Sequence, residues 1–166
     1  MKIAQASLIN TMMKSLTSTN AQERKLAVNA VLIALPDQGP MLVRTIAQSD
    51  EDKSVQAAAR QSLETRVTVL IRQLFASEAR ERISAAQDLV QGWRNDSSVV
   101  LELVTFAMQN SKNVNGVYNT VGVLNEFSLG ALQAHKAEIL KFVEVAKPTG
   151  SKTAAGATVL AKRVGA

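Results

Sequence analysis

The amino-acid sequence predicts an all-α protein, and three observations support that fold class. Nearly half of the 166 residues are hydrophobic but only 4% are aromatic, which favours helices over a β-sandwich. Apolar residues recur at helical spacing from one end of the chain to the other. The two strand-like runs, AVLIAL (30–35) and VTVLI (67–71), lie inside longer helical patterns and lack hairpin turns.

Turn-forming residues divide the chain into successive helices. TSTN (17–20) ends a first helix over residues 1–16, and Asn20 with Glu23 resembles a capping box that opens a second one. The second helix contains LAVNAVLIAL (26–35), which is apolar on nearly every side and therefore predicts burial on every side. Pro36, Gly39 and Pro40 then break the chain before a shorter helix.

Helix-capping residues recur along the chain and predict an internal repeat of paired helices. The predicted caps are Asn20, Asp50, Ser77 and Ser111, about 30 residues apart, and each opens a helix that a second helix follows. The segments that share this pattern are ERKLAVNAVLIAL (23–35), DKSVQAAARQSL (52–63) and EARERISAAQDLV (78–90). They resemble HEAT and armadillo-like repeats.

The resemblance implies an arrangement of the helices and a class of function. Its fold would be a right-handed α-solenoid of about four short HEAT-like hairpins, with an additional helix at each terminus. We expect one domain over residues 1–166, as a whole protein or as a piece of a larger one. Solenoids expose long surfaces that commonly hold another polypeptide, so the resemblance implies a non-enzymatic adaptor or scaffold.

The segment NVNGVYNTVGVLNEFS (113–128) predicts a helix with an unusually uncharged polar face. Val114, Val117, Val121 and Leu124 share the apolar face. The opposite face holds Glu126 and five uncharged residues: Asn115, Tyr118, Asn119, Gly122 and Asn125. Two interpretations stay open, because this face suits hydrogen-bonded packing against a neighbouring helix and also suits a partner-binding surface, where tyrosine is enriched and lysine and glutamate are depleted.

The net charge of +5 is concentrated near the C-terminus. Residues 135–166 carry six basic and two acidic side chains, which suggests binding to a nucleic-acid phosphate backbone as the alternative function. The candidate contacts are Lys141, Lys147, Lys152, Lys162 and Arg163. No aromatic residues alternate with these lysines, so we do not expect base stacking, and a solvated charged face explains them equally well.

The residues needed for catalysis or metal binding are scarce. The chain has no cysteine and one histidine, His135, so we expect no enzymatic activity, cofactor or metal site. The acids at 50–52 are explained by a helix N-terminus. TGSKT (149–153) resembles the end of a phosphate-binding loop, but Ser151 stands where that motif requires glycine before the lysine.

The remaining expectations concern partners and location. We expect a protein partner. We also expect pairing of copies through the C-terminal helix, because Ala154, Ala157, Leu160, Ala161 and Val164 form an apolar face that no later segment covers. The N-terminus lacks a signal-peptide core and no apolar run is long enough for a membrane span, so we expect a cytoplasmic protein without membrane contact.

Overall fold

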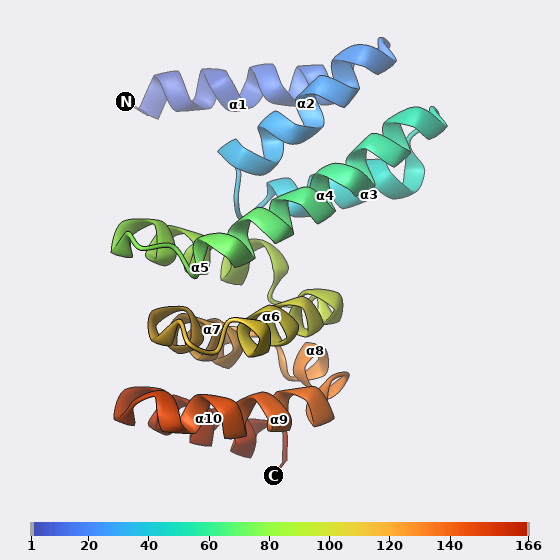
Figure 1. Ribbon diagram of the computed structural model, residues 1–166. Coiled ribbons are helices and arrows are strands. Elements are labelled where there is room, and N and C mark those ends of the chain that lie inside the picture. The colour runs from blue at the N-terminus through green and yellow to red at the C-terminus, as the bar shows by residue number, and fades with distance from the viewer. Residues whose placement is uncertain (1, 166) are drawn as a thin grey trace. The chain divides into compact units, whose positions relative to one another are not determined.

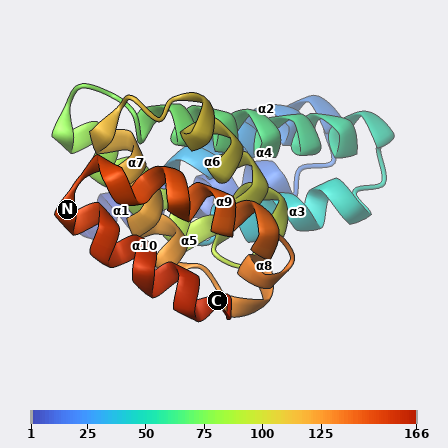
Figure 2. The same ribbon diagram turned by 60° about the horizontal axis from the view of Figure 1, so that its bottom comes forward.

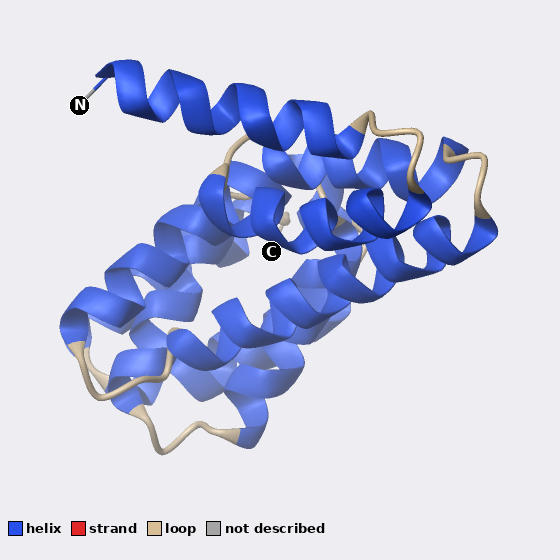
Figure 3. Cartoon of the chain, turned by 90° about the horizontal axis from the view of Figure 1, so that it is seen from above, coloured by secondary structure: helices blue, strands red, loops and turns tan. Residues whose placement is uncertain are grey.

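A computed structural model of the chain describes residues 2–165, with side chains from residue 6 onward. Within residues 2–165 the regular structure is entirely helical, which confirms the predicted fold class (Figure 3). None of these helices is both long enough and apolar enough to cross a membrane. The helices are α1 (Lys2–Leu16), α2 (Ala21–Ala34), α3 (Gly39–Ser49), α4 (Lys53–Gln73), α5 (Ala79–Trp93), α6 (Ser97–Gln109), α7 (Val114–Glu126), α8 (Leu129–Gln133), α9 (Lys136–Ala146), the 3₁₀ turn η1 (Lys147–Thr149) and α10 (Ser151–Arg163).

The chain forms two compact units, residues 1–66 and 67–166. The boundary falls inside the continuous helix α4. No glycine or proline lies in α4, so neither marks this boundary in the sequence.

In the first unit, α2 packs against α1 and α3. Val28, Val31 and Leu32 on α2 are fully buried, whereas Leu26 is 69% and Ile33 is 58% exposed. The prediction that this helix is buried on every side is therefore wrong. Its neighbours cover only part of its circumference, so helical periodicity decides which of its apolar residues are buried.

A buried ion pair joins α2 to the C-terminal end of α3. The guanidinium of Arg24 donates from Nε and Nη2 to the two carboxylate oxygens of Asp50, each at 2.9 Å. These side chains are only 7% and 6% exposed. The hydrogen bond from Arg24 lowers the pKa of Asp50 below its ordinary value of 3.8, against a smaller upward effect of burial.

The helix starts only partly match the predicted caps. Asn20 caps α2 as predicted, accepting from the backbone N–H of Gln22. Glu23 instead accepts a hydrogen bond from the Ser18 hydroxyl, so the capping box is absent. The other three helices begin one or two residues later than predicted. The residues that precede them are Asp52, Glu78 and Asn113, whereas the predicted caps are Asp50, Ser77 and Ser111.

The second unit has two layers of helices (Figure 1). In one layer α7 lies between α5 and α10, and in the other α6 packs against α9. Figure 2 brings α9 and α10 forward and shows them side by side. Large side chains fill the space between the layers, and Trp93, Leu103, Phe127 and Phe142 are almost completely buried there.

The apolar face of α10 is part of this core. Ala157, Leu160 and Val164 are at most 2% exposed, and α10 packs against both α7 and α9. The sequence-based expectation that this face lies uncovered is therefore wrong, because earlier helices of the same unit cover it. Pairing of copies through these side chains loses its structural basis.

Candidate functional site

Three asparagines of the uncharged segment bond to neighbouring parts of the second unit. Asn113 caps α7 and donates to the carbonyl oxygen of Phe75 at 2.9 Å. Asn119 donates to the carbonyl oxygen of Leu74 at 3.2 Å, and Asn125 donates to that of Gly156 at 3.0 Å. The packing interpretation therefore applies to Asn119 and Asn125, two of the five predicted partner-binding residues.

Glycines let other segments approach α7 closely. Gly116 is buried, and a Cβ atom added there would overlap the ring of Phe75. Phe75 in turn packs edge-on against Phe106, with 5.0 Å between the ring centroids. On the α10 side, a Cβ at Gly156 would lie 2.9 Å from Cγ1 of Val121.

The remaining three predicted residues, Asn115, Tyr118 and Gly122, stay on the surface. Together with Val114 they form what we call the α7 ridge. Asn115 and Gly122 are exposed, and Val114 and Tyr118 are each 49% exposed. Helical periodicity predicts that Val114 is buried in the core, and this prediction is wrong. Val114 is the first residue of α7, and its side chain is exposed at that end of the helix. The ridge carries no charged side chain.

Two hollows flank the α7 ridge. The hollow between α5 and α7 has a volume of about 330 Å³, and Val90, Gly122 and Glu126 are among its lining residues. The hollow between α7 and the start of α10 has a volume of about 420 Å³ and is lined by Val114, Asn115, Tyr118 and residues 149–153. We call the second one the α10 hollow. Side chains of a bound molecule can therefore enter on either side of the ridge.

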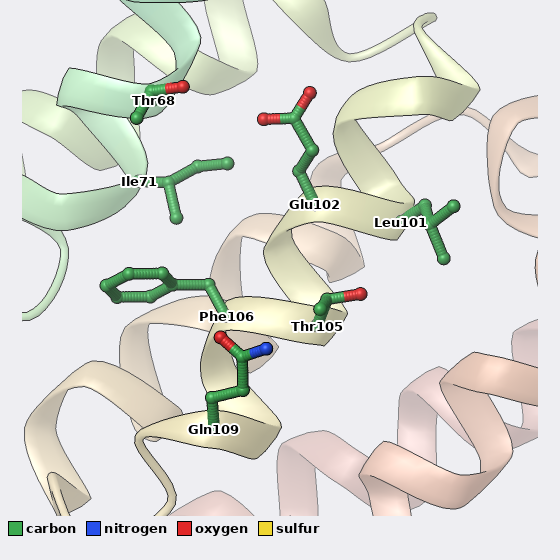
Figure 4. A pocket seen from close by; sticks show the side chains of 7 residues that line it. All are labelled: Thr68, Ile71, Leu101, Glu102, Thr105, Phe106 and Gln109. Atoms are coloured by element: carbon green, nitrogen blue, oxygen red, sulfur yellow. The ribbon is translucent and has the colours of Figure 1, made fainter.

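Another open pocket, of about 360 Å³, lies between α4 and α6 within residues 67–166 (Figure 4). Ile71, Leu101 and Phe106 are its apolar lining residues, and Glu102 and Gln109 lie on α6 to either side of Phe106. This pocket has no counterpart among the sequence-based predictions. Its residues come from two helices that are about 30 positions apart, so no local motif indicates it.

The five basic residues predicted to contact phosphates have different roles. Arg163 donates to the carbonyl oxygen of Phe127 at 2.8 Å and also bonds to those of Leu124 and Asn125. Lys147 pairs with Glu144 at 2.8 Å. The other three, Lys141, Lys152 and Lys162, are exposed, and of the five only Lys152 lines the α10 hollow.

The acidic segment before α4 is structural. Asp50 is bound by Arg24, and Asp52 caps α4 by accepting from the backbone N–H of Ser54 at 2.7 Å. Among the described residues, no three histidine or acidic side chains gather as metal ligands would. His135 is partly buried at the N-terminal end of α9.

Comparisons of the chain with protein-family models, with curated proteins and with solved structures find no match. The likeness to HEAT and armadillo-like repeats therefore stays a prediction from the residue pattern.

Proposed function

We propose that the chain is a non-enzymatic, HEAT-like helical-repeat module of the solenoid type that binds a polypeptide partner on the α7 ridge. The observation that carries this proposal is the exposure of Tyr118 on an uncharged surface between two hollows. Tyrosine supplies a large contact area at a small cost in conformational entropy, and an uncharged surface is desolvated at a small cost. A hollow on each side gives the partner's side chains a place to bind.

The layered packing of the second unit supports the repeat part of the proposal. Paired helices α6 and α7, followed by α9 and α10, contact each other within and between pairs, as successive hairpins of a helical repeat do. Helical-repeat proteins hold their partners on an extended surface to which successive repeats contribute. The α7 ridge and the two hollows beside it draw residues from α5, α7 and α10, which lie in one layer of the second unit.

Photocrosslinking tests the proposal directly. Tyr118 is replaced by p-benzoylphenylalanine, the crosslinked product from a lysate of the source organism is identified, and the purified partner is titrated against the protein. We expect the double substitution N115A/Y118A to weaken binding at least about tenfold. It should leave the free energy of unfolding within about 0.5 kcal/mol of wild type. Asn119 is not substituted, because its amide holds the carbonyl oxygen of Leu74.

A matched control and a salt series complete the design. Leu26 is an exposed apolar residue of the first unit, so L26A should change partner affinity less than about twofold. Binding that survives moderate salt and nuclease supports the proposal. Capture that instead requires nucleic acid, fades with salt and depends on Lys141, Lys152 and Lys162 would replace it with phosphate-backbone binding.

A further inference from the structure

The α10 hollow contains a helix N-terminus whose donors lack partners. The backbone N–H groups of Ser151, Lys152 and Thr153 form the first turn of α10, where an α-helix offers them no internal acceptor. No side chain caps this end, since Gly150 occupies the N-cap position. These donors lie at the positive end of the helix dipole, which favours a bound anion.

A nearly buried threonine without a hydrogen-bond partner in the protein independently indicates a ligand at the same place. Thr153 is only 2% exposed, yet it lines the α10 hollow, and no hydrogen bond joins its hydroxyl to a described residue. Its Oγ1 faces the start of the helix, 3.8 Å from the position that a Cβ would take at Gly150. The other buried threonine, Thr120, bonds to the carbonyl oxygen of Gly116 at 2.9 Å. Thr153 therefore offers a hydroxyl group without a protein partner to a molecule inside the hollow.

The remaining lining residues define the chemistry of that molecule. Lys152 contributes a positive charge, Ser151 and Tyr118 contribute hydroxyl groups, and Asn115 contributes an amide. None of these four side chains is hydrogen-bonded to another described residue, and no acidic side chain lines the hollow. The site therefore offers many donors and a positive potential to an anion with several acceptor oxygens.

We propose that the α10 hollow binds a phosphate monoester. A phosphate dianion presents more acceptor oxygens and more charge than a carboxylate, and so uses the backbone, hydroxyl and lysine donors together. The volume of about 420 Å³ leaves room for the group that carries the phosphate. The segment TGSKT thus binds phosphate through the start of a helix, without the glycine-rich loop of a nucleotide site.

The bound phosphate could belong to a small molecule or to a phosphorylated side chain of a polypeptide partner, and experiment distinguishes the two. Binding of inorganic phosphate tests the site alone. The phosphorylated side chain as ligand rests on the proposed function of the α7 ridge. Isothermal titration calorimetry of the purified full chain would use inorganic phosphate, a phosphoserine peptide, the same peptide with serine, and a single-stranded oligonucleotide. We expect saturable binding of phosphate and of the phosphoserine peptide, and no binding of the serine peptide. A higher affinity for the phosphoserine peptide than for phosphate would identify the phosphorylated side chain as the natural source.

Variants locate the binding. K152A should weaken phosphate binding at least about tenfold, and T153V, which removes the hydroxyl group at similar volume, about tenfold. K162A is the matched control, because Lys162 is an exposed lysine of the same helix outside the hollow, and it should leave affinity within about twofold. Circular dichroism melts would establish that each variant is folded.

Three results would overturn the proposal. Wild-type protein that binds neither phosphate nor the phosphoserine peptide has no such site. Equal losses in K152A and K162A would mean diffuse attraction to surface charge. Binding of the oligonucleotide alone would assign the lysines to a phosphodiester backbone. Failure of the crosslinking at position 118 while phosphate still binds would remove the proposed protein partner and leave this site intact.

Discussion

At the residue scale, the asparagines of α7 show why this helix has only one charged residue, Glu126. Asn119 and Asn125 each donate to a backbone carbonyl oxygen of another segment. A side-chain amide can donate a hydrogen bond to a partly buried carbonyl oxygen without the desolvation penalty that an ammonium or carboxylate group would incur there. Lysine or glutamate at either position would have to be buried or turned outward. The absence of charge at these two residues therefore follows from packing, whereas Asn115 and Tyr118 remain exposed.

A buried and an exposed glycine of α7 give a matched test of this packing. In G116A the new methyl group would overlap the Phe75 ring, so we expect the free energy of unfolding to fall by about 1–3 kcal/mol. In G122A the methyl group meets no atom within 4 Å, and better helix propensity should raise stability by about 0.5–1 kcal/mol. Urea denaturation followed by circular dichroism measures both. Equal effects of the two substitutions would contradict the close approach at Gly116.

At this scale, the sequence predicts which face of a helix is buried but not which residue each side chain contacts. Helical periodicity correctly placed Val117, Val121 and Leu124 in the core. It gave no information about which amide meets a carbonyl oxygen 31 to 45 positions away. The close contact at Gly116 was also not predictable from the sequence, because it depends on the ring of Phe75, which belongs to another segment.

At the element scale, Arg163 fixes the C-terminal end of α7 to α10. The last carbonyl groups of a helix lack internal donors and lie at its negative pole. Arg163 supplies donors to the carbonyl oxygens of Leu124, Asn125 and Phe127 from the last turn of α10. The guanidinium thereby acts as a cap that one helix provides to another.

Substituting Arg163 should therefore destabilise the fold rather than affect anion binding. We expect R163A to lower the free energy of unfolding by about 2 kcal/mol, because it leaves several carbonyl groups without donors. The neighbouring exposed residue gives the control, and K162A should stay within about 0.5 kcal/mol. Chemical denaturation of both variants measures the difference. Similar stabilities for the two would show that the cap contributes nothing.

The existence of the helices was predictable, but their starts were not. Polar residues cluster before each helix, as in DED at 50–52 and SKN at 111–113, and several of them make acceptable caps. Tertiary packing selects among them, so Asp52 and Asn113 cap the helices while Asp50 pairs with Arg24. The burial of the apolar face of α10 was missed for a similar reason, because helices α7 and α9 that cover it precede α10 in the chain.

At the scale of the whole molecule, acid acts on the first unit through one buried ion pair. This unit contains the buried Arg24–Asp50 pair, and the hydrogen bond from Arg24 lowers the pKa of the Asp50 carboxyl in the folded state. A depressed folded-state pKa means that the carboxylate contributes stability above its ordinary pKa of 3.8. That contribution is lost as pH falls through the lower, folded-state pKa. Acid should therefore weaken the attachment of α2 to α3.

Hydrogen exchange resolved by segment tests this expectation. Between about pH 5 and pH 2, and after correction for intrinsic exchange rates, protection of α2 and α3 should fall in the wild-type protein. In D50N, protection of these helices at pH 5 should be lower than in wild type, because Arg24 stays buried without its anion. The further loss of protection at low pH that depends on the Asp50 carboxyl should be absent. E64Q removes an exposed carboxyl group of the same unit and should behave like wild type. If D50N kept the full wild-type acid dependence, the ion pair would not be its source.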